Sequence, residues 1–199
     1  MRDMNEICTN CGSSAIFQQI APFTFVHGGK ETTIDDERTV CGTCGSIVYS
    51  GDQISRHELA VAAKIRELDG LLSAEALRRI RLKYALRQTD LEAMLSIGPK
   101  TWTRWERGKV PQNKAADTLI RVLATDPEVA RHLMMQANID NPAADAVFAQ
   151  IDEDTKRLAE ANLRARIIAS GRNMDIADMA QHAINAVREA RHELGVQAA

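Results

Sequence analysis

The residues with the clearest chemistry in this sequence are four cysteines, all within the first 44 residues. They form two C-x2-C pairs, Cys8 with Cys11 and Cys41 with Cys44. Two residues between thiolates let one tight turn direct both sulfurs at a single ion, and a second such turn completes a tetrahedral site with Zn–S bonds of about 2.3 Å. Because four thiolates leave no open coordination position, we predict a structural Zn²⁺ rather than a catalytic one.

Two other interpretations of the cysteines are weaker. Two disulfides need an oxidising compartment, whereas the segment Met1–Glu6 lacks the apolar core of a secretory signal and favours a cytoplasmic protein. A redox C-x2-C motif normally occurs singly, beside a βαβ unit. No apolar run approaches the roughly 20 residues that span a bilayer, so we also expect no membrane partner.

Strands and a helix must position these thiolates. Strand-like composition recurs between the two cysteine pairs, in the segments Phe17–Ile20, Phe23–Val26 and Glu31–Ile34. Helical periodicity begins near Ser55, which can cap a helix that runs to about Asp69. We therefore predict a small β-rich zinc-binding domain over residues 1–52 and a linker helix over residues 53–72.

Two short helices in the middle of the chain have the pattern of a DNA-binding module. The first covers Gln88–Leu95 and the second Pro99–Arg107, with a tight turn at Ser96–Gly98. A basic second helix of this kind enters the major groove in helix-turn-helix proteins. Trp102 and Trp105 share the opposite face, where we expect them to anchor the core rather than stack on bases.

The distribution of charge supports this interpretation. The 199 residues are 45% hydrophobic and 26% charged, which is typical of a globular protein, and the net charge is only −2. The net charge of residues 1–55 is −4, from 3 basic and 7 acidic residues. The net charge of residues 56–125 is +6, from 14 basic and 8 acidic residues. The net charge of residues 126–199 is −4, from 8 basic and 12 acidic residues. A basic segment between acidic ones favours a DNA-binding module with protein-binding flanks.

The stretch that begins with Leu86–Leu91 and ends with Trp105–Pro111 resembles the XRE (Cro/C1-type) helix-turn-helix. Together with the paired CxxCG motifs upstream, it makes the chain similar to the MqsA-type (YgiT-type) antitoxins over about residues 5–126. The resemblance implies a homodimer that binds a palindromic operator in double-stranded DNA and represses its own operon. It also implies that the zinc domain sequesters a toxin protein, often an mRNA-cleaving RNase.

Individual roles follow from the same resemblance. The implied DNA-binding residues are Gln88, Lys100, Thr101, Thr103 and Arg104. Of these, Lys100 and Arg104 match base-reading positions, and Gln88 matches a phosphate-contacting position. Arg81 and Glu106 match a structural pair that bridges the scaffold helices. Two departures are Arg87, in place of a capping Thr or Ser, and Ser96, in place of a turn glycine, which we expect to reshape the turn around Gly98.

The chain continues for about 70 residues beyond the typical length of that family. We expect a helix at Glu128–Ala137 and two long Ala-rich helices at about Asp152–Ala169 and Ile176–Leu194. These last two suggest an αα-hairpin. Two interpretations of this hairpin are equally good. In one it joins two copies or binds a partner, and in the other it folds back on its own domain.

The sequence therefore predicts a mainly α protein, with the β-rich zinc domain, an all-α helix-turn-helix domain over residues 73–126 and a helical extension over residues 127–199. His57-Glu58 and His192-Glu193 begin like a metalloprotease motif, but neither has a second histidine, so we expect no enzyme. We predict a cytoplasmic, DNA-binding repressor that is the antitoxin of a type II toxin–antitoxin system. The alternative is a prophage or mobile-element regulator without a toxin, whose C-terminal helices serve oligomerisation or partner binding.

Overall fold

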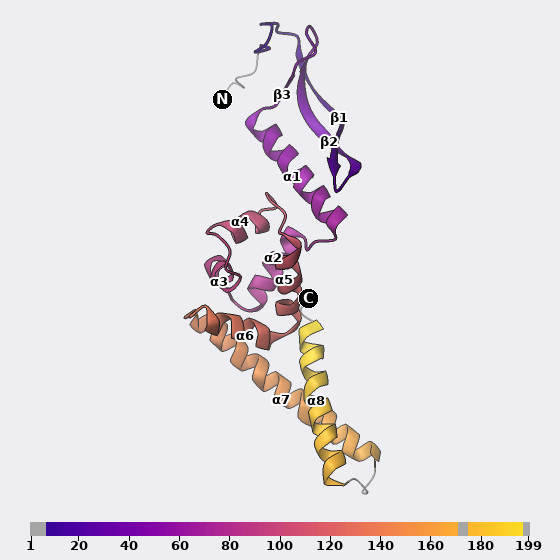
Figure 1. Cartoon of the computed structure of the whole chain (residues 1–199), viewed down its shortest axis with the longest axis vertical. Helices are drawn as coiled ribbons and strands as arrows, with labels where there is room; N and C mark the ends of the chain where they lie inside the picture. Colours follow the sequence, from indigo (N-terminus) through magenta and orange to yellow (C-terminus); the bar gives the residue numbers. More distant parts are fainter. Residues whose placement is uncertain (1–6, 171–174, 197–199) are drawn as a thin grey trace. The chain divides into compact units, whose positions relative to one another are not determined.

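The computed structural model describes residues 7–170 and 175–196, which fold as two compact units (Figure 1). The N-terminal unit comprises the chain up to Ser73 together with Arg107–Pro111, and the C-terminal unit comprises Ala74–Glu106 and the chain from Gln112 onward. Helices predominate, and the small sheet lies in the N-terminal unit with the cysteines, so the predicted fold class is confirmed. None of the described helices has an apolar stretch long enough to cross a membrane.

A long β-hairpin forms most of the sheet, whose strand order is β1-β2-β3. Strands β1 (Ile16–His27) and β2 (Lys30–Cys41) are antiparallel and pair along their whole length, and β3 (Ile47–Val48) adds to the other edge of β2. The turn residues Gly28 and Gly29 have φ of 56° and 78°. A type I′ turn needs positive φ at both positions, and glycine adopts it without steric cost.

β1 is one continuous strand, although the sequence predicted two short strands on either side of Pro22. The strand lies at the edge of the sheet, and Pro22 pairs with Asp35. Proline is tolerated on an edge strand because its missing N–H can face away from the neighbouring strand, where no ladder hydrogen bond is lost.

Helix α1 (Gly51–Asp69) packs against β2 and begins four residues before the predicted start at Ser55. Ser50 is its N-cap: the Ser50 side chain accepts the N–H of Gln53, and the Gln53 side chain accepts the N–H of Ser50. This capping box satisfies two amides at once. The prediction of Ser55 as the cap was wrong, since its hydroxyl donates to a carbonyl within the first turn.

The interior of the N-terminal unit is largely polar. The side chain of Asp36 is fully buried, accepts a hydrogen bond from Tyr49 Oη at 2.5 Å and lies 2.8 Å from His57 Nδ1. Arg66 is also buried and donates to two carbonyls of the segment Arg107–Pro111, which it holds against this unit. A small unit with so little buried apolar surface usually depends on an additional cross-link.

Five short helices form the body of the C-terminal unit: α2 (Ala74–Lys83), α3 (Gln88–Met94), α4 (Thr101–Glu106), α5 (Lys114–Thr125) and α6 (Pro127–Gln136). Their core contains fully buried large side chains, among them Trp102, Tyr84 and Leu91. Tyr84 Oη donates to the carbonyl of Leu123 at 2.9 Å, so this buried hydroxyl has a partner. The unit thus has the conventional apolar core that the N-terminal unit lacks.

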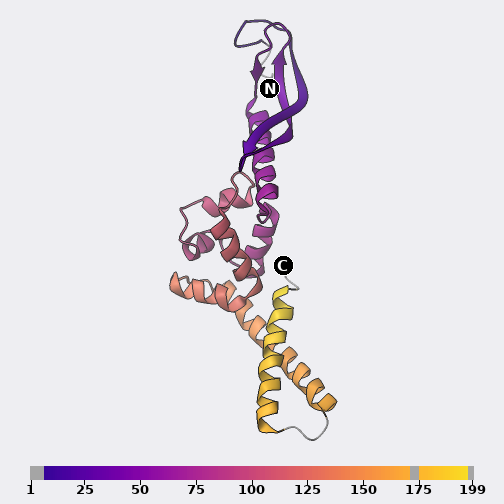
Figure 2. The ribbon, with the colours of Figure 1, turned by 45° about the vertical axis from the view of Figure 1, so that its right-hand side comes forward.

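The C-terminal extension is a hairpin of two long helices, α7 (Pro142–Ser170) and α8 (Ile176–Val196), as a second view shows (Figure 2). α7 begins ten residues before the predicted start at Asp152. Asn141 caps it by accepting the N–H of Ala144 at 3.3 Å, and Phe148 stacks on Tyr84 at 5.4 Å between ring centroids. The base of the hairpin therefore packs on the body of its own unit.

Candidate functional site

The four cysteine sulfurs come together in the N-terminal unit. All four lie within 4.8 Å of one another, and none is in a disulfide. The Sγ atoms of Cys8 and Cys44 are 3.7 Å apart, and those of Cys11 and Cys41 are 3.6 Å apart. In a regular tetrahedron with Zn–S bonds of about 2.3 Å, the sulfurs are separated by about 3.8 Å. The cluster therefore has the dimensions of a four-thiolate metal site.

The two C-x2-C pairs lie on turns of the same geometry. In each turn the glycine N–H donates to the carbonyl of the first cysteine, at 2.8 Å for Gly12 and 2.9 Å for Gly45. The N–H of that cysteine donates in turn to the carbonyl of the following serine, Ser13 or Ser46, at 2.7 and 3.0 Å. Both glycines have left-handed φ, 72° and 73°. The repeated pattern C-x2-C-G-S is the signal that identifies these two serines, which the sequence analysis did not single out.

Polar neighbours alter the acidity of the sulfurs. Ser46 and Asn10 hydrogen-bond the sulfur of Cys44, at 3.2 and 3.6 Å, and lower the pKa of that thiol to about 5. At Cys11 a hydrogen bond from the backbone of Ser13 lowers the pKa, but the other sulfurs and desolvation outweigh it and raise the pKa to about 12. Hydrogen bonds from the backbone of Cys44 and Thr43 lower the pKa of Cys41 as well. Ionisation of all four thiols nevertheless requires a cation among the sulfurs. The donor set fits a tightly held metal ion.

In the C-terminal unit, the carboxylate of Glu106 joins three helices. Arg81 donates to it from Nε at 2.6 Å and from Nη2 at 3.2 Å. Gln88 Nε2 donates at 2.7 Å, and Trp102 Nε1 donates at 2.6 Å. Burial opposes ionisation of Glu106, but these hydrogen bonds and the charge of Arg81 outweigh it and hold the pKa of the carboxyl below its ordinary value.

Hydrogen bonds continue from this carboxylate toward the surface. Thr103 Oγ1 donates to Gln88 Oε1 at 2.8 Å, so both ends of the Gln88 amide are engaged within the protein. Both residues were predicted to contact DNA, and their bond to each other was not foreseen. Gln88 therefore bridges Glu106 and Thr103 and fixes the position of α3 against α4.

Lys100, Thr101 and Arg104 lie at the start and on the outer face of α4. Lys100 and Arg104 are exposed, and Thr101 is half-buried. Within residues 7–170 and 175–196, neither cation has a hydrogen-bond or ion-pair partner. Trp102 and Trp105, on the other side of the same helix, are 0% and 4% exposed, so both belong to the core as expected.

The turn between α3 and α4 differs from the prediction. Ser96 itself adopts the left-handed conformation, with φ of 51°, so the turn is not reshaped around Gly98. Lys100 also has positive φ, 63°, which prevents the helix from starting at Pro99. The carboxylate of Glu92 accepts an N–H in the first turn of α4, at 3.1 Å, and so stabilises the later start.

Arg87 lies at the N-cap of α3 but does not cap it with its side chain. Instead Asp90 accepts the N–H of Arg87 at 2.8 Å and forms an ion pair with its guanidinium at 2.9 Å. The amide of Asn141, just before α7, donates to the same carboxylate at 2.8 Å. The Arg87 side chain is thus occupied within the protein, and the extension supports the start of the helix-turn-helix.

The pKa of Glu106 leads to a prediction about stability. At neutral pH, Glu106→Gln should lower the free energy of unfolding of the C-terminal unit by about 1.5–3 kcal/mol, the usual contribution of hydrogen bonds to a charged group. This difference should shrink as the pH falls below about 4.5, because the wild-type protein loses the stabilisation from its carboxylate as the pH falls through the lowered pKa. Urea unfolding followed by tryptophan fluorescence measures it.

Glu153→Gln, which makes the same charge change at an exposed position of α7, is the matched control and should leave stability unchanged. If the loss of stability in Glu106→Gln does not vary between about pH 3 and pH 7, the charge of Glu106 does not contribute to the free energy of unfolding.

Comparison with known proteins places these sites in a family. Residues 6–134 match the family model described as the antitoxin component of bacterial toxin–antitoxin system, MqsA. No match was found among the curated proteins. The matched residues include the cysteine cluster and helices α1–α5, whereas α7 and α8 lie beyond them. Because the match covers more than half of the chain, the protein belongs to the MqsA family of antitoxins.

Proposed function

We propose that this antitoxin is a cytoplasmic repressor that binds operator DNA as a homodimer, contains a structural Zn²⁺ and acts by binding rather than by catalysis. The observation that carries the DNA-binding part is a pair of exposed cations, Lys100 immediately before α4 and Arg104 on it, neither of which has a side-chain partner among the described residues. The family supports the antitoxin part, and the four-cysteine geometry supports the metal.

Some other surface cations of the same unit are paired with carboxylates. Arg131 pairs with Asp152 at 2.9 Å, and Arg157 pairs with Asp154. The described residues offer no such partner to Arg104, whose guanidinium remains available for a ligand. A guanidinium can donate two hydrogen bonds to O6 and N7 of guanine in the major groove, and this is the commonest specific contact in protein–DNA complexes.

The interior of the unit holds this surface in place. The tryptophans anchor one side of α4 in the core, and Glu106 fixes the orientation of Trp102, Gln88 and Arg81. Backbone and side-chain contacts to phosphate would position the helix, and Arg104 with Lys100 would select the sequence. Two copies of the unit would then read two half-sites about one helical turn apart.

Arg104→Ala should weaken binding to a specific duplex by about 5- to 150-fold, or 1–3 kcal/mol. The duplex is obtained by repeated selection from a random-sequence pool, and affinity is measured by fluorescence anisotropy at fixed salt. Arg157→Ala removes the same charge from an exposed position of α7 and should have little effect. Equal losses on selected and random duplexes would contradict a base-reading role for Arg104.

The metal would act as a cross-link within the N-terminal unit. The four cysteines would hold Zn²⁺ with no open position, so the ion would supply folding free energy rather than reactivity. We expect one Zn²⁺ per chain by elemental analysis. Chelation, or Cys44→Ser, should release it and unfold the cysteine turns while the tryptophan fluorescence of the C-terminal unit is unchanged. Stoichiometric zinc retained by Cys44→Ser would rule out this ligand set.

Toxin binding would use the open face of the β-hairpin. Ile20 and Val26 are 73% and 66% exposed, and each lies directly opposite an acidic residue of β2, Glu37 or Glu31. Directly opposite residues of an antiparallel pair share one face of the sheet. Glu37 is paired with Arg56, but Glu31 and Asp35 on this face are exposed. The face therefore combines exposed apolar and acidic side chains, which complements a basic, RNA-binding toxin with apolar contacts.

Ile20→Lys and Val26→Lys should each weaken the complex with the toxin encoded beside this gene by about tenfold or more, because each removes an apolar contact and adds a like charge. Isothermal titration calorimetry measures the affinity. Leu82→Lys, at an exposed apolar position of α2, is the control. Wild-type affinity in both β1 variants would contradict this placement of the toxin.

A further inference from the structure

The C-terminal extension contacts the helix-turn-helix through a polar turn just before α7. Asn141, in this turn, is 6% exposed. Its amide donates to the carbonyl of Ala85 at 3.1 Å and to the carboxylate of Asp90 at 2.8 Å. Its side-chain oxygen accepts the N–H of Ala144 in the first turn of α7. One buried side chain thus joins the extension both to the loop before α3 and to α3 itself.

The same turn holds the side chain of Arg87. The guanidinium donates from Nε to Asp90 at 2.9 Å and from Nη2 to the carbonyl of Asp140 at 2.9 Å. A guanidinium has five N–H donors, so these two bonds leave three for a ligand. The side chain of Arg87 is 60% exposed, whereas that of Asp90 is 4% exposed. The ion pair therefore presents its positive end to solvent, in an orientation that the protein fixes.

Arg87 lies at the end of α3 that contacts α4. The next residue, Gln88, is hydrogen-bonded to Thr103 and Glu106, both on α4, at 2.8 and 2.7 Å. Thr103 directly precedes Arg104, the exposed cation that we propose to read bases. When a helix lies in the major groove, exposed cations beside it are placed to meet the phosphates along the edge of the groove. The side-chain amide of Gln88 is engaged at both ends within the protein, whereas Arg87 keeps free donors.

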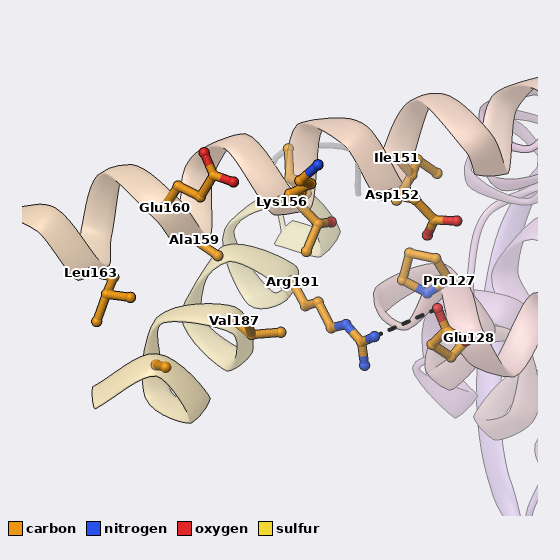
Figure 3. Close-up of a pocket in the computed structure, with 13 residues that line it drawn as sticks. Pro127, Glu128, Ile151, Asp152, Lys156, Ala159, Glu160, Leu163, Val187 and Arg191 are labelled. Atoms are coloured by element: carbon orange, nitrogen blue, oxygen red, sulfur yellow. Dashed lines mark ion pairs between the residues drawn. The ribbon is translucent and has the colours of Figure 1, made fainter. Parts of the chain in front are cut away.

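Elsewhere the extension meets the body of the unit more loosely. A groove of about 400 Å³ lies between α7, α8 and the start of α6, where Arg191 is 3.9 Å from Glu128 (Figure 3). Near Asn141, by contrast, the ring of Phe148 stacks on that of Tyr84 at 5.4 Å between centroids. The closely packed contact of the extension is thus at its first residues, beside the turn that holds Arg87.

We propose that Arg87 contacts a phosphate of the operator and that the turn Asp140–Asn141 positions it for this contact. Asn141 fixes the turn, and the turn places the carbonyl that accepts Nη2 of Arg87. An arginine that is already held in place loses little side-chain freedom on binding, so more of its interaction contributes to affinity. The proposal rests on the proposed DNA binding and extends it to residues beyond those that match the family model.

The salt dependence of binding tests the phosphate contact. Each phosphate that the protein neutralises contributes about 0.9 to the slope of log affinity against log salt concentration. With two copies on the selected duplex, Arg87→Met should reduce this slope by about 1.8 and the affinity by about 30-fold at 0.15 M salt. Random duplexes should lose affinity by a similar factor, so that the preference for the selected duplex remains. Arg157→Met, which removes the same charge from α7, should leave the slope unchanged.

The outcomes separate this proposal from the one on which it rests. An unchanged slope in Arg87→Met, or a loss of affinity confined to the selected duplex, would overturn the phosphate contact alone. A wild-type protein that binds no duplex would overturn the proposed DNA binding as well. Circular dichroism checks that each variant is folded.

A double-mutant cycle tests the positioning role. Asn141→Ser keeps an oxygen that can cap α7 but removes the amide that donates to Asp90 and Ala85. It should weaken binding by about 2- to 5-fold per copy, comparable with the cost of ordering one long side chain. The slope should keep its wild-type value, because the charge of Arg87 is still present. Asn113→Ser makes the same change at the cap of α5 and should have no effect.

In the Arg87→Met background, Asn141→Ser should weaken binding no further. An equal loss in both backgrounds would overturn the positioning role, since the turn would then affect affinity by a route that does not involve Arg87.

Discussion

The arrangement of α2, α3 and α4 depends on one buried carboxylate, that of Glu106. A buried carboxylate is strongly destabilising unless donors surround it. Here Arg81, Gln88 and Trp102 supply those donors from α2, α3 and α4, so the requirement to satisfy one charge fixes three helices against each other. Arg104 lies on the exposed side of the same helix, α4. An internal electrostatic constraint thus fixes the helix that exposes Arg104.

The two units achieve stability by different means. The C-terminal unit has a conventional core of large apolar side chains, among them Trp102 and Tyr84. The N-terminal unit instead buries Asp36, Gln53 and Arg66, and it contains four sulfurs within the dimensions of a metal site. A polar interior contributes little net free energy, which explains why we propose a bound ion as the cross-link of this unit and none for the other.

Much of this structure could be predicted from local patterns, and the errors have physical causes. The spacing of the cysteines and the positions of the helices follow from short motifs. The cap of α1 was misplaced because the prediction followed helical periodicity, whereas Ser50 and Gln53 carry the S-x-x-Q signature of a capping box. The start of α4 depends on Glu92, ten residues away from the amide that it accepts, and on left-handed φ at Lys100. The internal role of Gln88 depends on contacts between helices, which single-residue correspondence does not provide.

The central claim is that α4 reads DNA from the major groove. Methylation interference on the selected duplex tests it most directly, because dimethyl sulfate modifies guanine N7 in the major groove and adenine N3 in the minor groove. We predict that methylation of guanine N7 in two half-sites, about 10 base pairs apart, prevents binding. Interference from adenine N3 alone, or from no base, would contradict a major-groove role for this helix.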